Sequence, residues 1–213
     1  MLFLRRLLPG LVALMICAGA GAGSAVAQTG DEIRARLDAR RHGAMVFIGT
    51  SIADGYLRQL LVEPWQGSYG DDTLAGGTYS YHLLRFSRFF TLSAELGGAY
   101  RFGQTQGGQF WATLFLRYDG FPWTEYLYTT VGVSMGPDFV TRLPQPERGT
   151  DLRPERNQSR FLNNFSPEIS VALPSAPEHQ VVFRYIHRSG VFGSFNGVYE
   201  GANVAILGYR FRF

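Results

Sequence analysis

The C-terminal region of the chain alternates apolar and polar residues with a period of two in two successive segments. Residues 181–213 read VVFRYIHRSGVFGSFNGVYEGANVAILGYRFRF. In the last segment Arg210 and Arg212 share one face, and the other face carries a run of apolar or aromatic residues: Ala205, Leu207, Tyr209, Phe211 and Phe213. Because side chains alternate between the two faces of a β-strand, this pattern predicts strands with one apolar face. A soluble protein has no reason to expose such an aromatic ladder to water. The ladder is typical of a barrel strand whose outer face meets lipid.

The same alternation recurs along the chain and predicts eight strands. The clearest example is 89–101, where Phe90, Leu92 and Leu96 fall on one face and Ser93 and Glu95 on the other. Several segments have the roughly 9–11 residues that a tilted strand needs to cross a bilayer, and eight is the smallest strand number of such barrels. We therefore predict an all-β fold, an eight-stranded antiparallel transmembrane β-barrel of the bacterial outer membrane, built by residues 44–213. The expected strands are 44–51, 79–86, 89–101, 109–119, 127–136, 165–173, 180–189 and 203–213.

The connections between the expected strands support this fold because several of them alternate in length. Long segments occupy 52–78 and 141–164, whereas short ones occupy 87–88 and 174–179. Outer-membrane barrels have short periplasmic turns and longer extracellular loops. With both ends of the barrel domain in the periplasm, the connection that follows 180–189 is expected to be extracellular.

The N-terminal region has the pattern of an export signal. Arg5 and Arg6 precede an apolar run over 7–20, and Ala25 and Ala27 form an A-x-A-type cleavage site. We expect residues 1–27 to be a cleaved signal peptide, which contains the single cysteine, Cys17. Residues 28–43 are polar and charged, and are expected to form a short helix or a disordered periplasmic segment.

Composition points to no soluble ligand. All 20 basic residues are arginine, which reflects either a GC-rich genome or bidentate binding of phosphates near lipopolysaccharide. Without Arg5 and Arg6, the basic residues are close in number to the 17 acidic residues, so charge favours no nucleic-acid partner. His42, His82 and His179 lack metal-ligand spacing, and no glycine-rich turn precedes a helix. We predict no metal and no cofactor; a homodimer is compatible with the sequence, which does not fix the oligomeric state.

His187 and Ser189 lie two residues apart in the segment 180–189 and therefore share a face. Their odd positions match the apolar set Val181, Phe183 and Tyr185. The even face carries Gln180, Arg184 and Arg188, although Val182 and Ile186 on that face blur the contrast. The parity places His187 and Ser189 on the lipid-facing wall, at the outer-leaflet end of the strand. One interpretation is a harmless polar pair at the headgroup boundary; the other is a functional site, because polar groups facing lipid are costly. On another strand, Glu95 and Arg101 share the inward face and form a candidate ion pair.

The segment around this pair resembles the lipid A 3-O-deacylase family, of the acyloxyacyl hydrolase type, in a divergent form. The family motif is His-x-Ser followed by a glycine- and asparagine-rich loop and an acidic residue, and the chain has His187-Arg188-Ser189 and, further on, Glu200. FPWTEYLYTTVGVS and FLNNFSPEISVALP also resemble the fifth and sixth strands of that family. The resemblance implies an eight-stranded outer-membrane barrel with a Ser-His-Glu triad on its outer surface, which hydrolyses the ester that links an acyl chain to the 3 position of lipid A.

Carried over residue by residue, the resemblance assigns Ser189 as nucleophile, His187 as general base and Glu200 as the residue that orients the imidazole. The family usually has asparagine after the serine, where this chain has Gly190, which still offers a backbone N–H to an oxyanion. Glu200 is one residue off the commonest spacing, and Asn196 or Asn203 are alternatives as the third member or as an oxyanion donor.

The sequence thus predicts an outer-membrane serine esterase with lipid A of lipopolysaccharide as its substrate. The alternative is a non-catalytic barrel with a structural or adhesive role. Five arginines of the connection 141–164 are candidates to bind lipid A phosphates, with an ordinary solvated loop as the alternative: Arg142, Arg148, Arg153, Arg156 and Arg160.

Overall fold

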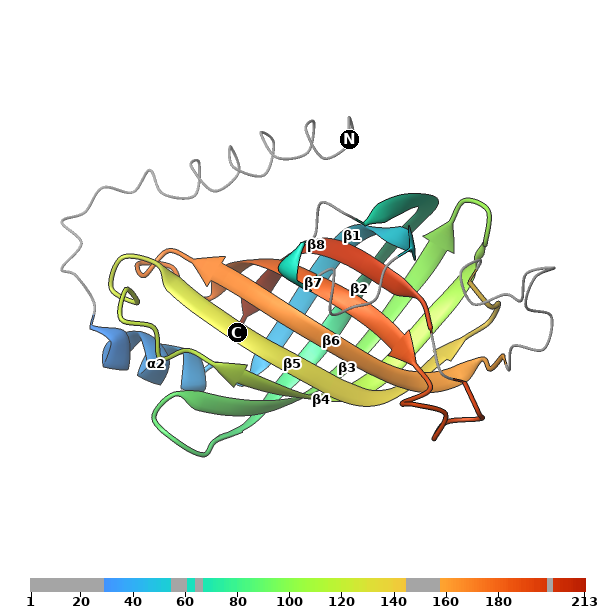
Figure 1. Ribbon diagram of the computed structural model, residues 1–213. Helices are drawn as coiled ribbons and strands as arrows, with labels where there is room; N and C mark the ends of the chain where they lie inside the picture. Colours follow the sequence, from blue (N-terminus) through green and yellow to red (C-terminus); the bar gives the residue numbers. More distant parts are fainter. Residues whose placement is uncertain (1–28, 55–60, 64–66, 145–157, 199–200) are drawn as a thin grey trace.

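The computed structural model describes residues 29–54, 61–63, 67–144, 158–198 and 201–213, and these form a closed barrel of eight strands (Figure 1). Each strand pairs antiparallel with its neighbour in the chain, and the first pairs with the last. The predicted eight-stranded antiparallel barrel is confirmed. The strands are β1 (His42–Asp54), β2 (Ser68–Arg85), β3 (Phe90–Phe102), β4 (Gly107–Tyr118), β5 (Tyr128–Val140), β6 (Phe161–Ala172), β7 (His179–Ser189) and β8 (Asn203–Arg212).

The largest departure from the predicted strands is at the β1–β2 hairpin. β2 begins at Ser68 instead of residue 79, and β1 continues to Asp54, so the connection between them is much shorter than 52–78. The added part of β2 reads SYGDDTLAGGT, where glycines and paired acidic residues hide the alternation. It is a strand because the backbone hydrogen bonds of a closed barrel form whatever the side chains are, and Thr73 to Thr78 pair with both neighbours.

The outer wall of the barrel is apolar and the inner wall is largely polar. Outward positions include Val46 and Leu96, whose side chains are 66% and 61% exposed. Inward positions alternate with them, and many are buried Thr, Ser, Asn, Gln, Arg or Glu. This distribution is the reverse of that of a soluble protein and is typical of a barrel that spans a membrane with its outer face in lipid. No helix in the described part of the chain is long and apolar enough to cross a membrane.

A network of buried ion pairs fills one side of the lumen. Arg184 of β7 lies 2.6 Å from Glu95 of β3 and 2.6 Å from Glu168 of β6. Arg117 and Arg210 also pair with Glu168, so three cations surround this carboxylate. Each charge is paired, as a buried ion must be to survive outside water.

The predicted pair of Glu95 with Arg101 is wrong, because the partner of Glu95 is Arg184. Both residues do face inward and are buried. However, the two residues are six positions apart on the strand, about 20 Å at 3.3 Å per residue, so their side chains cannot meet. The Arg101 guanidinium donates instead to the Gln109 side chain on β4, at 3.3 Å.

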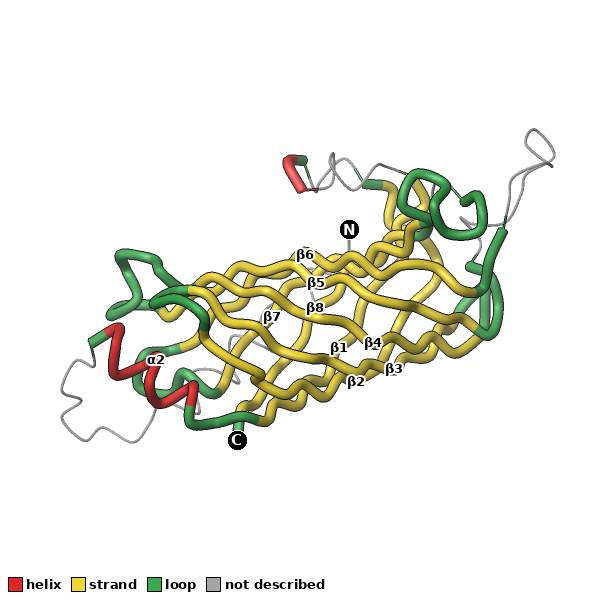
Figure 2. The backbone as a smooth tube through the Cα atoms, turned by 90° about the horizontal axis from the view of Figure 1, so that it is seen from below, coloured by secondary structure: helices red, strands yellow, loops and turns green. Residues whose placement is uncertain are grey.

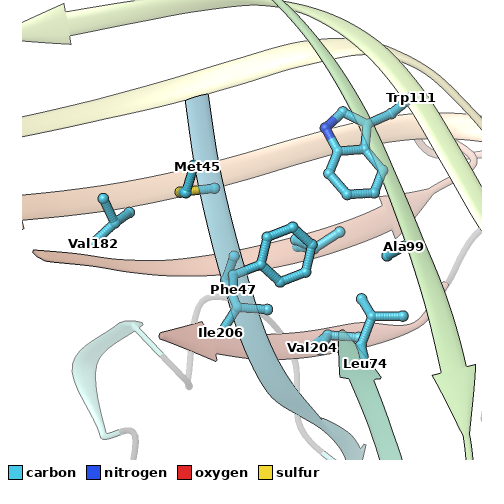
Figure 3. Packing of buried hydrophobic residues seen from close by; sticks show 9 residues of the cluster. Met45, Phe47, Leu74, Ala99, Trp111, Val182, Val204 and Ile206 are labelled. Carbon is cyan, nitrogen blue, oxygen red and sulfur yellow. The ribbon is translucent and has the colours of Figure 1, made fainter. Parts of the chain in front are cut away.

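The lumen also holds an apolar cluster (Figure 3). Val182 and Ile186, which obscure the alternation in the sequence of β7, belong to it and face inward. Ile186 pairs with Val204 of β8, which belongs to the same cluster. The cluster consists of Met45, Phe47, Leu74, Ala99, Trp111, Val182, Ile186, Val204 and Ile206.

Helix α2 (Gly30–Asp38) lies at one end of the barrel, together with Phe213 and the 119–127 connection (Figure 2). Thr29 caps the helix in a capping box with Glu32, and Ile33 and Leu37 are buried against Tyr128 and Ala172. We call this end the turn end and the opposite one, which carries the connections 103–106, 141–160 and 190–202, the loop end. A short helix is therefore the observed alternative for the segment 28–43, while the predicted signal peptide, 1–27, lies outside the described residues.

Hydrogen bonds and ion pairs hold α2 on the barrel. Arg212 of β8 donates to the carbonyl oxygen of Leu37 at 3.0 Å. Asp31, in the first turn, accepts from Arg88 of the β2–β3 connection and from Arg34, and these bonds lower the pKa of its carboxyl group to about 2. Asp31 therefore stays charged, and paired, in neutral and mildly acidic solution.

We predict that Arg184→Leu lowers the free energy of unfolding by about 3–5 kcal/mol, since it leaves buried Glu95 and Glu168 with fewer cations. The measurement is urea unfolding in lipid vesicles or micelles. Arg41→Leu is the control, because the exposed side chain of this arginine makes only one hydrogen bond among those of the described residues, 3.4 Å to the Tyr81 hydroxyl group. Equal stability of the two variants would show that the luminal pairs do not hold the barrel together.

Candidate outer-wall site

Strand β7 displays His187 and Ser189 on the outer wall because its alternate residues are anchored in the lumen. Gln180, Arg184 and Arg188 are at most 1% exposed, whereas His187 and Ser189 are half-buried on the other face. Arg188, which lies between them in sequence, donates from Nε to Asp138 of β5 at 2.6 Å. The guanidinium also donates to the carbonyl oxygen of Arg160 at 3.0 Å. The loop-end terminus of β7 is therefore held from inside, and the outward orientation predicted for both residues agrees with the burial pattern.

The His187 imidazole is oriented by Asn203 on the neighbouring strand β8. The two residues are directly opposite each other in the β7–β8 register, and His187 Nδ1 lies 2.7 Å from Asn203 Oδ1. An amide oxygen only accepts hydrogen bonds, so this contact is a hydrogen bond when Nδ1 carries the proton, and Nε2 of the neutral imidazole is then an acceptor. This is the tautomer that a general base next to a serine requires.

Ser189 is the outward residue that follows His187 on the same strand. Their Cα atoms are about 7 Å apart, the spacing of i and i+2 in a strand. Ser189 Oγ accepts a hydrogen bond from the Val191 N–H at 3.1 Å. No hydrogen bond joins Ser189 to His187 among the described residues, so the serine is turned toward the loop that follows it. The catalytic role predicted for the pair requires Oγ to turn from the Val191 N–H toward the imidazole.

The loop after Ser189 is compact and its backbone is strained. Phe195 N–H donates to the Gly190 carbonyl at 2.8 Å, and Gly193 and Val198 are joined at 3.1 Å. Val191 has φ of 49° and Phe192 has φ of 54°, in the left-handed region that costs a β-branched or aromatic residue about 1–3 kcal/mol. Such strain is maintained only where surrounding contacts enforce it, and it clusters at functional sites.

Gly190 is required by the close approach of this loop. A Cβ atom at position 190 would lie 1.8 Å from the Val198 carbonyl oxygen, so no other residue fits without moving the loop. This explains why glycine stands where the resembled family has asparagine. Gly190 retains the backbone N–H next to Ser189 that the sequence analysis assigns to an oxyanion.

The other predicted site residues divide into three groups. Asn196 lies in the loop, and its amide donates to Ser159 Oγ at 2.9 Å and to the Phe161 carbonyl at 3.0 Å, which ties the loop to the start of β6. Glu200 lies outside the described residues, as do Arg148, Arg153 and Arg156. Arg142 and Arg160 are described and are exposed at the loop end.

Within the described ranges no three His, Cys, Asp or Glu side chains are grouped so that they could hold a metal ion. Strands β1 and β2 also contribute to the same wall, which the alternation in the sequence does not reveal. Tyr69 and Ile52 pair with each other in the hairpin extension, the parts of β1 and β2 that lie beyond the predicted strands 44–51 and 79–86.

No protein-family model matches the chain, and no curated protein matches it. Among solved structures it is similar to the outer-membrane enzyme PagL, at 11% identity and a TM-score of 0.45, over 80% of this chain and 99% of that one. It is also similar to the N-terminal β-barrel domain of Pseudomonas aeruginosa OprF, at 13% and 0.43, over 82% of this chain and 98% of that one. A third similar structure is Ail, the attachment invasion locus protein of Yersinia pestis, at 13% and 0.38, over 82% and 99%. Likenesses this distant do not decide between enzyme and non-catalytic barrel.

We predict that Gly190→Ala opens the 190–198 loop, because the added Cβ would overlap the Val198 carbonyl. Amide hydrogen exchange of residues 191–198 should speed up by at least tenfold, while exchange in the strands stays unchanged. Gly98→Ala is the matched control, since a Cβ there would meet only the Phe110 ring at 3.5 Å. Unchanged protection of the loop in Gly190→Ala would contradict the packing described here.

Proposed function

We propose that the chain is an outer-membrane serine esterase that removes the acyl chain ester-linked to the 3 position of lipid A. The observation that carries this proposal is the 2.7 Å hydrogen bond from His187 Nδ1 to Asn203 Oδ1, next to an outward-facing Ser189. An oriented imidazole beside a serine is the constellation that makes a hydroxyl nucleophilic. It lies on a wall whose other outward residues are mostly apolar and exposed.

The location of this pair matches a membrane-lipid substrate. The apolar outer wall supports insertion into the bacterial outer membrane, and the predicted export signal leads there. With the short turns and α2 in the periplasm, the loop end is extracellular, and His187 and Ser189 lie level with the outer leaflet. Lipid A would then reach the site by lateral diffusion, so no deep cavity is needed. Exposed Arg142 and Arg160 at the loop end are available to its phosphates.

In the proposed reaction Ser189 Oγ attacks the ester carbonyl carbon while His187 Nε2 takes the hydroxyl proton. The Gly190 N–H donates to the oxyanion of the tetrahedral intermediate. The intermediate collapses with cleavage of the bond from the carbonyl carbon to the sugar oxygen, and the imidazolium returns its proton to that oxygen. Water then attacks the acyl-serine with His187 again as base, which releases the fatty acid and restores Ser189.

The third residue of the triad in this proposal is Asn203, in place of the acidic residue that the resemblance implies. The Asn203 amide oxygen fixes the imidazole tautomer, as asparagine does in Cys-His-Asn hydrolases. A neutral amide stabilises the imidazolium less than a carboxylate would, so this triad should turn over slowly compared with a Ser-His-Glu one.

We predict that the purified protein, incubated with lipopolysaccharide, releases one 3-hydroxyacyl chain that mass spectrometry of lipid A detects. Ser189→Ala should lower the rate by at least about a thousandfold, and Asn203→Leu by about a hundredfold or more through loss of the tautomer. Ser194→Ala, a change of an exposed serine in the same loop, is the matched control and should leave the rate unchanged.

Three outcomes contradict parts of the proposal. No release by a folded protein would favour the non-catalytic barrel. Release that persists in Ser189→Ala would place the chemistry elsewhere. A full loss in Glu200→Gln together with a full rate in Asn203→Leu would restore Glu200 as the orienting residue.

A further inference from the structure

One patch of the outer wall is covered, although it lies among residues that face lipid. Ile52 of β1, Tyr185 of β7 and Ala205 of β8 are outward but only 2%, 3% and 8% exposed, and they form one cluster. Tyr185 and Ala205 are directly opposite each other in the β7–β8 register, and Ile52 pairs with Asn203. The covered patch therefore borders the His187–Asn203 pair on its β8 side.

Tyr69 of β2 reaches this patch from the hairpin extension. It pairs with Ile52 in the β1–β2 register, and its hydroxyl group is hydrogen-bonded to that of Tyr185. The two rings thus form a bridge that crosses the outer wall over β1 and β8; we call it the tyrosine bridge. A hydroxyl group on a lipid-facing wall has no water to bond, so each tyrosine satisfies the other and both rings are held in place.

On the β6 side of His187 the outer wall is exposed. Phe165 of β6 is the residue opposite His187, and the β6–β7 ladder is interrupted between this pair and the next one, Glu168 with Arg184. Pro167, which has no N–H to donate, lies in the interruption. Phe183 and Ile169, further toward the turn end, are 38% and 43% exposed. The β6–β7 seam is therefore an apolar surface that leads from the site toward the membrane centre.

We propose that the tyrosine bridge is the specificity wall of the site, which directs the acyl chain of the substrate into the β6–β7 seam and limits the chains that fit. This inference rests on the proposed esterase function. An acyl chain whose carbonyl lies at Ser189 must run down the outer wall toward the membrane centre. Tyr185 is four residues further along β7, about 13 Å, so its ring borders the middle of a long acyl chain and not the short ones.

The test compares hydrolysis of p-nitrophenyl esters from butyrate to palmitate in identical detergent micelles. The variants are Tyr69→Phe, which removes only a hydroxyl group of the bridge, and Tyr69→Ala, which removes a ring. Tyr79→Phe is the matched control, because it also removes a hydroxyl group from β2, one that is hydrogen-bonded to His42 at the turn end. We expect Tyr69→Ala to change the ratio of kcat/KM for palmitate to that for butyrate by about tenfold, the effect of an altered apolar wall, with butyrate hydrolysis within about twofold of wild type. Tyr69→Phe should shift the ratio in the same direction by a smaller factor.

The outcomes separate the two proposals. If the wild-type protein hydrolyses none of the esters and leaves lipid A intact, the esterase function itself is wrong. If the wild type is active and Tyr69→Ala keeps the wild-type ratio, the esterase stands and the tyrosine bridge is not a specificity wall. An equal change in Tyr79→Phe, or an equal loss for butyrate and palmitate in Tyr69→Ala, would indicate a general structural effect and would also overturn the inference.

Discussion

The inward anchoring of β7 by buried arginines is the interaction on which the display of the site depends. Arg184 is paired with Glu95 and Glu168, and Arg188 with Asp138, all inside the lumen. A slip of one residue would bring these guanidinium groups to the lipid face and bury His187 and Ser189 in the lumen. The energy of that slip is large because two buried cations would lose their partners at once. The charges of the lumen therefore fix the chemistry of the outer wall.

The site also depends on being assembled across strands that are distant in sequence. His187 comes from β7, its orienting Asn203 from β8, and the covered patch beside them from β1 and β2, which meet β8 only because the barrel closes. Closure thus makes a three-sided arrangement: a hydrogen-bonded base, a strained loop beyond Ser189, and a tyrosine-covered wall. In the proposed reaction the bilayer would supply the fourth side, so that a small barrel with a filled lumen could act on a lipid.

The sequence predicted the fold well because apolar and polar side chains alternate with a period of two in a barrel wall that has lipid on one side. The prediction failed where this alternation is weak. The segment SYGDDTLAGGT is part of β2 because it pairs with both neighbouring strands, although its side chains alternate poorly. The outward direction of His187 and Ser189 followed from parity alone. The contact of His187 with Asn203 did not follow from parity, because it depends on the register between β7 and β8, which no pattern within one strand encodes. Tyr69 was hidden for the same reason, since its partner Tyr185 is more than a hundred residues away in the chain.

The most direct test of the central claim is covalent labelling of the protein in lipid vesicles by a long-chain alkyl fluorophosphonate, which reacts with serine made nucleophilic by a neighbouring base. Peptide mass spectrometry then locates the adduct. The account predicts one adduct on Ser189, delivered through the bilayer, and its loss in His187→Ala and in Asn203→Leu. A correctly folded barrel that takes up no label on Ser189, or labels it equally well in both variants, would contradict the claim that this outward-facing trio is a catalytic site.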